Sequence, residues 1–243
     1  TFAPINISFD SSAVSDLGGV AIGGTASLVA SGGVVGLGTI LANVSASALQ
    51  SGDTGTGPEK ERGAAFFTNE ATPPSSTGGT IQFDVTDTVI NINGDLLLNA
   101  SASGSEGIGA LQGGTIAINA NNGSLLVGDL ISANVSAEES ASALGVQPGA
   151  VRGGTITALV SNNGDILASA MNYGANAVSG GDTVGGSVSL TTNSGGRIRS
   201  TGTIGIDASA MTRGLESAGD AIGGNIIVNI NSGSLQSGPL ILD

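Results

Sequence analysis

Alternating apolar and polar positions, each series introduced by a pair of glycines, recur along this chain of 243 residues. The clearest copy is residues 113–126, where two glycines precede an alternating run, an Asn-Gly pair and a second apolar run. After each glycine pair the second and fourth residues are apolar, which is typical of a strand with one buried face. The copies begin at Gly23-Gly24, Gly78-Gly79, Gly113-Gly114, Gly153-Gly154, Gly185-Gly186 and Gly223-Gly224.

A turn and two further short elements are predicted after each alternating run. Asn, Ser and Gly favour the left-handed conformation of tight corners, and we place turns at Asn93-Gly94, Asn122-Gly123, Asn163-Gly164, Ser194-Gly195 and Ser232-Gly233. A second apolar run follows at Leu96, Leu125, Ile166, Ile198 and Leu235. Small residues form a third element at Ser11-Ser12-Ala13, Val44-Ser45-Ala46, Ala100-Ser101-Ala102, Val135-Ser136-Ala137, Ala168-Ser169-Ala170 and Ala208-Ser209-Ala210.

The repeat length restricts the fold class. Repeats of this size indicate a solenoid or a propeller, and a propeller needs about four antiparallel strands per blade with aromatic signatures. Aromatic residues make up only 2% of this chain. We therefore predict an all-β fold, a right-handed parallel β-helix (β-solenoid) of about six to seven three-strand coils, with the handedness taken by analogy. Polar, Gly-rich loops at 103–112, 138–152, 171–184 and 211–222 would absorb the differences in repeat length.

We expect residues 1–243 to form a single β-solenoid domain with one long inserted loop at 47–77. Equivalent apolar positions would stack into an inner column, formed by Ala26, Ile81, Ile116, Ile156, Val188 and Ile226. The loop contains Lys60, Arg62, Phe66 and Phe67. Two interpretations stay open: the two Phe side chains pin the loop onto the solenoid, or these four residues form an interaction site, because long loops in compact domains are often functional.

Both ends of the chain match the same part of the repeat. Residues 9–13 match residues 206–210, and Leu240-Ile241-Leu242-Asp243 stops at the equivalent of Asp207. No amphipathic capping helix is predicted at either end, and an uncapped solenoid exposes a sheet edge that favours pairing. Two expectations follow: the solenoid continues in a longer chain, or copies associate end to end into a filament.

The repeat resembles the shafts of filamentous haemagglutinin-like exoproteins, which Gram-negative bacteria and cyanobacteria secrete by the two-partner route. The segments most similar to that family are residues 223–228, 185–190 and 206–210. The resemblance covers residues 78–243 well and 1–46 loosely, and no segment matches the family's amino-terminal secretion domain. It implies a right-handed β-helix, an extracellular or cell-surface location, and roles in adhesion, matrix or filaments. It implies no catalytic residues.

Charge excludes some classes of partner. The net charge is −13, from 19 acidic and 6 basic residues, so phosphate backbones and anionic membranes would be repelled. No apolar run in the sequence is long enough to span a bilayer. We therefore expect neither nucleic-acid binding nor membrane insertion, and we expect an acidic surface that repels other copies.

Histidine and cysteine are absent, which excludes thiolate and imidazole metal sites and the Ser-His-Asp and Cys-His nucleophile systems. We predict no catalytic, cofactor-binding or metal residues. A polysaccharide-degrading β-helix is the enzyme alternative, because such enzymes pair carboxylates in a groove. The candidates are Asp84, Asp87, Asp165 and Asp207, with Arg197 and Arg199 as charge partners. The scarcity of aromatic sugar platforms and of bases argues against it.

Two binding functions are weaker alternatives. Calcium prefers clustered carboxylates and carbonyls, and an Asp follows Gly at Asp95, Asp129, Asp165, Asp182 and Asp220. The tandem calcium nonapeptide is not present, however. Ice binding would use a flat threonine array, and Thr80, Thr115 and Thr155 are at equivalent positions. Ser187 and Asn225 continue that column, so the array does not persist.

The sequence therefore favours a non-catalytic structural or adhesive β-solenoid of an exported bacterial cell-surface or extracellular-matrix protein. The expected partners are further copies or further solenoid of the same chain, and host-surface or matrix glycans. A self-assembling extracellular filament subunit is the alternative, stacked head to tail through uncapped ends.

Overall fold

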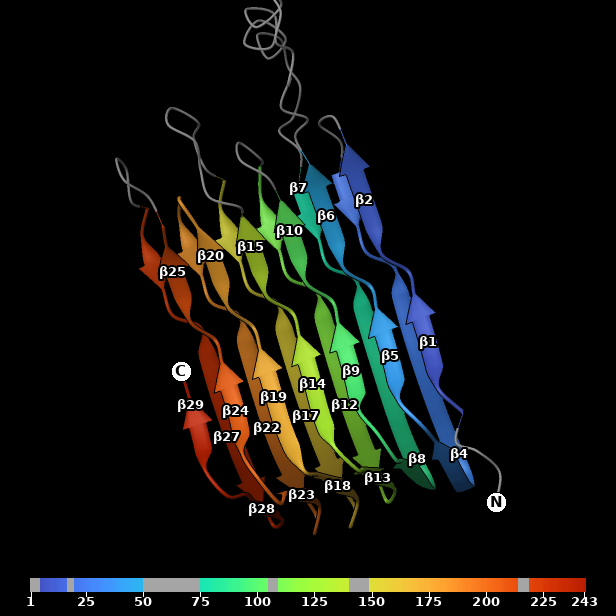
Figure 1. Cartoon of the computed structure of the whole chain (residues 1–243). Coiled ribbons are helices and arrows are strands. Elements are labelled where there is room, and N and C mark those ends of the chain that lie inside the picture. The colour runs from blue at the N-terminus through green and yellow to red at the C-terminus, as the bar shows by residue number, and fades with distance from the viewer. Residues whose placement is uncertain (1–4, 17–19, 50–74, 105–108, 140–148, 214–218) are drawn as a thin grey trace, which may run out of the picture.

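The computed structural model describes residues 5–16, 20–49, 75–104, 109–139, 149–213 and 219–243, and this part of the chain contains strands and no helix. Its strands pair in parallel and form four sheets, A to D. The chain passes through A, B, C and D in turn, then returns to A beside its previous strand (Figure 1). Six such circuits are followed by one further strand of sheet A. The prediction of an all-β fold is confirmed.

Sheets A and B contain the first strands of each circuit. Sheet A consists of β1 (Ile7–Asp10), β5 (Ile40–Asn43), β9 (Leu96–Asn99), β14 (Leu130–Asn134), β19 (Ala170–Gly174), β24 (Ile204–Asp207) and β29 (Leu240–Leu242). Sheet B consists of β2 (Ala13–Asp16), β6 (Ala46–Leu49), β10 (Ala102–Gly104), β15 (Ala137–Glu139), β20 (Ala177–Ser179) and β25 (Ala210–Thr212).

Sheets C and D complete each circuit. Sheet C consists of β3 (Val20–Ile22), β7 (Ser75–Thr77), β11 (Leu111–Gln112), β16 (Val151–Arg152), β21 (Thr183–Val184) and β26 (Ala221–Ile222). Sheet D consists of β4 (Thr25–Leu37), β8 (Thr80–Ile92), β12 (Thr115–Asn121), β13 (Ser124–Val127), β17 (Thr155–Ser161), β18 (Asp165–Ala168), β22 (Ser187–Asn193), β23 (Arg197–Ser200), β27 (Asn225–Asn231) and β28 (Ser234–Gln236).

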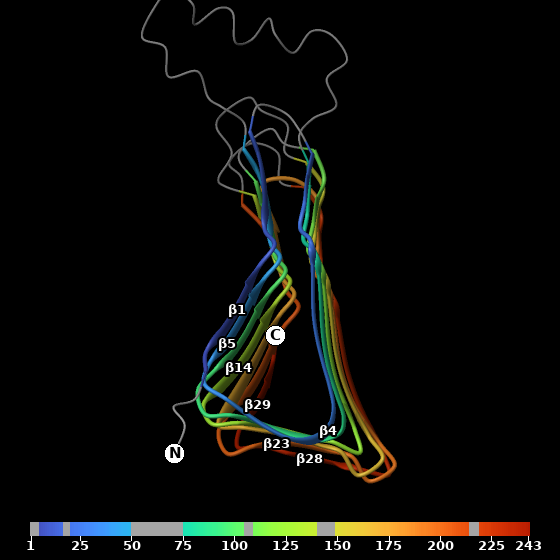
Figure 2. The same cartoon turned by 90° about the vertical axis from the view of Figure 1, so that its right-hand side faces the viewer.

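Seen along the stack, the circuits have a triangular outline with a narrow extension (Figure 2). Sheet A and the two halves of sheet D form the triangle, while sheets B and C face each other in the extension. The main hydrophobic core fills the triangle, and the extension has a separate small core. That small core consists of Ala48, Ala102, Leu111, Ala137, Val151 and Ala177. Small side chains therefore allow sheets B and C to lie close together.

The glycine pairs lie where the triangle narrows into the extension. In every circuit the N–H of the second glycine donates to a carbonyl of the opposite wall, at 2.6 to 2.9 Å, as Gly154 does to Val135. A Cβ on Gly153 would lie 2.0 Å from the carbonyl oxygen of Ala175, and one on Gly154 would lie 2.1 Å from that of Gly114. The first glycine thus meets the opposite wall and the second meets the preceding circuit, both without room for a side chain, which explains the glycine pairs of the inner circuits.

The predicted inner column is confirmed, because successive members pair in register from Ala26 to Ile226. The predicted corners are partly wrong. Asn122, Asn163, Ser194 and Ser232 have the expected positive φ angles. Asn93-Gly94, however, lies at the next corner, between sheets D and A. Ile90, which precedes it, pairs with Leu125 in sheet D, and Leu96, which follows it, pairs with Ile131 in sheet A. In the second circuit β8 runs around the earlier corner as one strand, with Asp87 at a positive φ in place of an Asn-Gly turn.

The small-residue element was also misplaced in one circuit. Ala137 pairs with Ala177 and Ala177 with Ala210, so the fifth copy is residues 175–177. Residues 168–170 instead connect β18 to β19. The prediction of a loop at 171–184 in this circuit is wrong for the same reason, since β19 and β20 occupy much of that range. Each circuit accordingly has strands in sheets B and C that a three-strand repeat does not contain.

The long loop predicted at 47–77 is shorter at both ends, because its first residues belong to β6 and its last to β7. The rest of it lies outside the described residues. Nowhere in the described chain is there a helix with the length and apolar character needed to cross a membrane.

Candidate functional site

The outer surface bends inward where sheet A continues into sheet B, and this crease runs along the stack (Figure 2). Outward side chains of equivalent circuits form columns along it, because the strands pair in register. The central column contains Asp10, Asn43, Asn99, Asn134, Gly174, Asp207 and Asp243. Polar residues therefore occupy every position of this column along the bend except Gly174.

Amide side chains form a ladder in the first four circuits of this column. The Nδ2 atoms of Asn43, Asn99 and Asn134 each donate to the Oδ1 atom one circuit earlier, at 3.1 to 3.4 Å. Each Oδ1 also accepts the backbone N–H of a serine two residues later, as Asn134 does from Ser136 at 3.1 Å. Such Asx-turns favour a local change of direction. The ladder therefore both joins the circuits and turns the chain from sheet A into sheet B.

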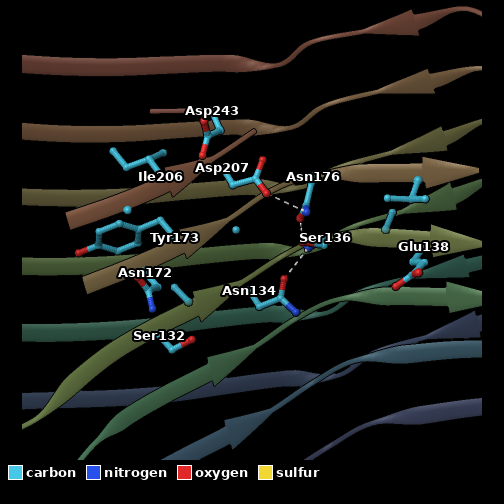
Figure 3. A pocket seen from close by; sticks show the side chains of 15 residues that line it. Ser132, Asn134, Ser136, Glu138, Asn172, Tyr173, Asn176, Ile206, Asp207 and Asp243 are labelled. Atoms are coloured by element: carbon cyan, nitrogen blue, oxygen red, sulfur yellow. Dashed lines mark hydrogen bonds between the residues drawn. The ribbon is translucent and has the colours of Figure 1, made fainter. Parts of the chain in front are cut away.

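Gly174 interrupts the ladder in the fifth circuit. The amide of that circuit comes two residues later, at Asn176, which donates from Nδ2 to Asp207 Oδ2 at 3.0 Å and accepts from Ser136 Oγ. A surface hollow of about 530 Å³ lies at this interruption. Figure 3 shows Asn134, Ser136, Asn176 and Asp207 joined in one chain of hydrogen bonds along it.

Oxygen atoms surround the position that the missing side chain would occupy. A Cβ on Gly174 would lie 3.4 Å from Asn134 Oδ1, 3.5 Å from Ser136 Oγ and 3.8 Å from Asn176 Oδ1. At Gly205, in the next circuit, a Cβ would lie 3.2 Å from Asn172 Oδ1. Hydrogen-bond acceptors therefore surround the two glycines, while apolar residues such as Val178 and Ile206 also line the hollow.

The charges at the hollow are mainly negative. Asp207, Asp243 and Glu138 line it, and Asp207 Oδ1 accepts the backbone N–H of Ser209 at 2.9 Å. Arg213 lies 3.6 Å from Glu138 in an exposed pair, which contributes little stability. Cationic side chains do not line the hollow among the described residues. The site therefore suits a ligand that donates hydrogen bonds and carries no negative charge.

Beneath the hollow, Tyr173 points into the main core and is 2% exposed. Its hydroxyl donates to Met171 Sδ at 3.5 Å, a weak acceptor. Burial raises the pKa of Tyr173 well above its ordinary value, because the phenolate would lack solvation. Tyr173 is therefore a structural residue and presents no ring to a ligand in the hollow.

The structure brings Asp165 together with Arg199 and Arg197, but it does not bring the four carboxylate candidates together. Asp84 lies on the outward face of sheet D, where it accepts from Asn119 Nδ2 at 2.7 Å. Asp87 lies at the corner of that sheet, and Asp207 lies in the crease. Asp165 lies on the other half of sheet D and binds Arg199 through two hydrogen bonds, which raise the pKa of Arg199. Arg197, the remaining candidate, pairs in register with Asp165. These carboxylates do not line a common groove.

The calcium candidates are also dispersed. Asp95 and Asp129 lie on neighbouring circuits at the corner between sheets D and A, while Asp182 and Asp220 precede strands of sheet C. Asp165 is bound to Arg199. Within the described residues no three acidic side chains form a group that could hold a metal ion.

The threonine column predicted from the repeat is present on the outward face of sheet D. Thr80, Thr115 and Thr155 pair in register, and Thr25 precedes them. Ser187 and Asn225 continue the column, and Gln82 and Ala117 lie where a second threonine column would be required. The face thus lacks a repeated Thr-x-Thr array.

The proposed interaction residues Lys60, Arg62, Phe66 and Phe67 lie outside the described residues. The sequence interpretation missed the hollow, because the misplaced small-residue element at 168–170 hid the fact that Gly174 replaces an asparagine. The available signal was the recurring Asn-x-Ser triplet at Asn43, Asn99 and Asn134, which is absent from the fifth circuit. Comparison with protein-family models, curated proteins and solved structures finds no match to this chain.

Proposed function

We propose that the six circuits are coils of a right-handed parallel β-helix, and that this helix is the non-catalytic shaft of an exported bacterial surface or extracellular-matrix protein. The observation that carries this proposal is the continuous in-register stacking of every sheet across all six circuits. In such a stack each coil buries its apolar residues only against its neighbours, so length can grow without a change in cross-section. A shaft requires that property.

The surface chemistry supports a structural role outside the cell. The described carboxylates are spread over separate faces instead of converging on a catalytic groove, and the chain as a whole carries a net charge of −13. The resemblance to filamentous haemagglutinin-like shafts provides the exported location, and the absence of cysteine is compatible with it.

Immunogold labelling of intact cells tests the location. An antibody against the folded chain should label the outside of unpermeabilised cells or the material around them, and protease treatment of intact cells should remove that label. Label that appears only after permeabilisation would contradict an exported shaft.

The filament alternative has its own supporting observation. Core positions of the sixth circuit and of β29 are exposed, with Ile230 at 51% and Leu242 at 50%. In the first circuit, the core-facing residues Ile7, Phe9 and Leu28 are only partly buried. A second copy could cover such surfaces. In such a stack, β1 of the second copy would have to pair with β24 of the first. β29 already pairs with β24, so sheet A has one strand too many for in-register stacking of the described circuits.

Negative-stain electron microscopy at several protein concentrations, with and without calcium, distinguishes the two assemblies. The shaft proposal predicts short single rods at every concentration. Long thin fibres whose length grows with concentration would favour end-to-end self-assembly, and fibres only with calcium would restore the calcium alternative.

A further inference from the structure

We propose that the hollow at Gly174 is a binding site for a neutral, hydroxyl-rich carbohydrate chain lying along the crease between sheets A and B. The interrupted ladder motivates this assignment. In the second to fourth circuits an asparagine Nδ2 fills the central column and donates to the Oδ1 before it. At Gly174 no side chain supplies that donor to Asn134, so a hydroxyl group of a ligand takes its place.

The acceptors around this position match the donors of a sugar. Asn134 Oδ1, Ser136 Oγ and Asn176 Oδ1 surround the absent Cβ at 3.4 to 3.8 Å, close enough for one ligand hydroxyl to reach more than one of them. Asn172 Oδ1 and the Asp207 carboxylate extend the row of acceptors into the next circuit. Val178 lines the sheet B side of the hollow and provides an apolar contact for the C–H face of a sugar ring.

The size and shape of the site favour a chain molecule over an ion. A volume of about 530 Å³ falls within the usual range for small-molecule sites, about 300–1,000 Å³. The described residues also lack the acidic group of three or more that could hold a metal. The neighbouring carboxylates of Asp243 and Glu138 disfavour anionic glycans.

The test is a binding measurement on the whole chain by isothermal titration calorimetry. The probes are linear neutral oligosaccharides of six units, namely β-1,4-glucan, α-1,4-glucan, β-1,4-mannan and N-acetylglucosamine oligomers, with heparin hexasaccharide and calcium chloride as competing classes. We expect saturable binding of at least one neutral oligosaccharide. We expect no binding of heparin, and no effect of calcium on the neutral ligand.

Gly174→Asn is the decisive variant, because it restores the ladder and occupies the position in the hollow that the acceptors surround. A Cβ at this position meets its nearest atom at 3.4 Å, an ordinary van der Waals distance, so the variant should fold. We expect at least a tenfold loss of affinity, with a melting temperature equal to or above that of the unchanged chain. Gly36→Asn is the matched control, because a Cβ there has open space within 4 Å, and its binding should be unchanged.

A second variant keeps the test independent of how Gly174→Asn folds. Asp207→Asn retains an oxygen for the N–H of Ser209, but it removes the charged acceptor and replaces Oδ2, which accepts from Asn176 Nδ2, with a donor. The variant therefore changes two acceptors of the site, and binding should weaken about tenfold. The proposal is overturned if no neutral oligosaccharide binds, if heparin or calcium alone binds, or if Gly174→Asn and Asp207→Asn bind as tightly as Gly36→Asn. This inference needs only the folded chain, so its failure leaves the shaft proposal standing.

Discussion

At key positions of this protein, the residue type depends on how closely backbone segments approach each other more than on side-chain chemistry. Gly153 has no room for a Cβ because two backbone walls meet there. The equivalent Gly223 has open space within 4 Å, since no further circuit covers it. The same sequence motif is therefore under different constraints in the interior and at the end of the stack, and this difference can be tested.

Gly153→Ala should destabilise the chain strongly, by about 3 kcal/mol or more, because the added methyl group forces the opposite wall away and weakens the hydrogen bond from Gly186 N–H to the Ala175 carbonyl. Gly223→Ala should change stability by less than about 1 kcal/mol. Urea unfolding followed by circular dichroism measures both. Equal effects would contradict the close contact of the two walls.

Tyr173 predicts a loss of stability at alkaline pH. Burial raises its pKa in the folded state, so the folded chain holds a proton that the unfolded chain releases above about pH 10. The contribution of this proton to the free energy of unfolding is therefore fully present below about pH 10. Above that pH the free energy of unfolding falls by about 1.4 kcal/mol per pH unit.

Tyr173 is the only tyrosine in the chain, so its ionisation can be followed directly by absorbance near 295 nm. We expect the tyrosinate signal to rise together with the loss of the β-sheet circular dichroism signal, and Tyr173→Phe to reduce the alkaline loss of stability. Ionisation with a midpoint near pH 10 in a chain that stays folded would show that Tyr173 is not buried.

At the level of strands and corners, the asparagine ladder is the main set of polar side-chain interactions between circuits. Asn99 is in the middle of it, donating to Asn43 and accepting from Asn134. It also caps the turn into sheet B through the N–H of Ser101. Three hydrogen bonds therefore depend on one side chain, in a part-buried position where unpaired amide groups are costly.

Asn99→Ala should lower the free energy of unfolding by about 1–3 kcal/mol. Asn91→Ala removes the same side chain from the outward face of β8 and should cost less than about 1 kcal/mol. Thermal unfolding of the two variants checks this difference. If both melt at the same temperature, the ladder does not stabilise the stack.

The sequence predicted the elements whose apolar pattern recurs clearly in each copy, and it missed those whose pattern recurs only faintly. The glycine pairs and the alternating strands that follow them are in register as predicted, because large apolar residues such as Ile116 and Ile156 mark them. The predicted small-residue element includes the first residue of most sheet B strands, such as Ala102 and Ala137. The rest of sheets B and C lies in the predicted loops, because these short strands around a small core carry little periodic signal. Asn93-Gly94 was placed at the wrong corner because β8 turns without an Asn-Gly pair.

The candidate site was missed for a related reason, although the Asn-x-Ser triplet absent from the fifth circuit was a signal for it. Its defining feature is the absence of a side chain at Gly174, and an absence is recognised only when the register of the surrounding circuits is known. Of the carboxylates and arginines selected from the sequence, Asp165 is buried beside Arg199, and Asp84, Asp87 and Asp207 lie on other parts of the molecule. Residue type alone could not show which of them share a face.

The whole molecule is a linear stack in which each circuit contacts mainly its neighbours, as expected for repeat proteins. Residues distant in sequence are thereby brought to adjacent positions, as Thr115 and Thr155 are on the outward face of sheet D. β12, which contains Thr115, lies between β8 with Thr80 and β17 with Thr155, so Thr80 and Thr155 lie two strands apart. Strand spacing in sheets is about 4.8 Å, which places these two residues about 9.6 Å apart.

Disulfide cross-linking of this column tests the stacking most directly, because the chain contains no cysteine of its own. A disulfide requires Cα atoms within about 4.4–6.8 Å. The double variant Thr115→Cys/Thr155→Cys should therefore cross-link within the folded monomer under mild oxidation, while Thr80→Cys/Thr155→Cys should remain reduced; in urea both pairs should lose this selectivity. Failure of the first pair, or equally efficient cross-linking of the second in the folded chain, would contradict the in-register stack.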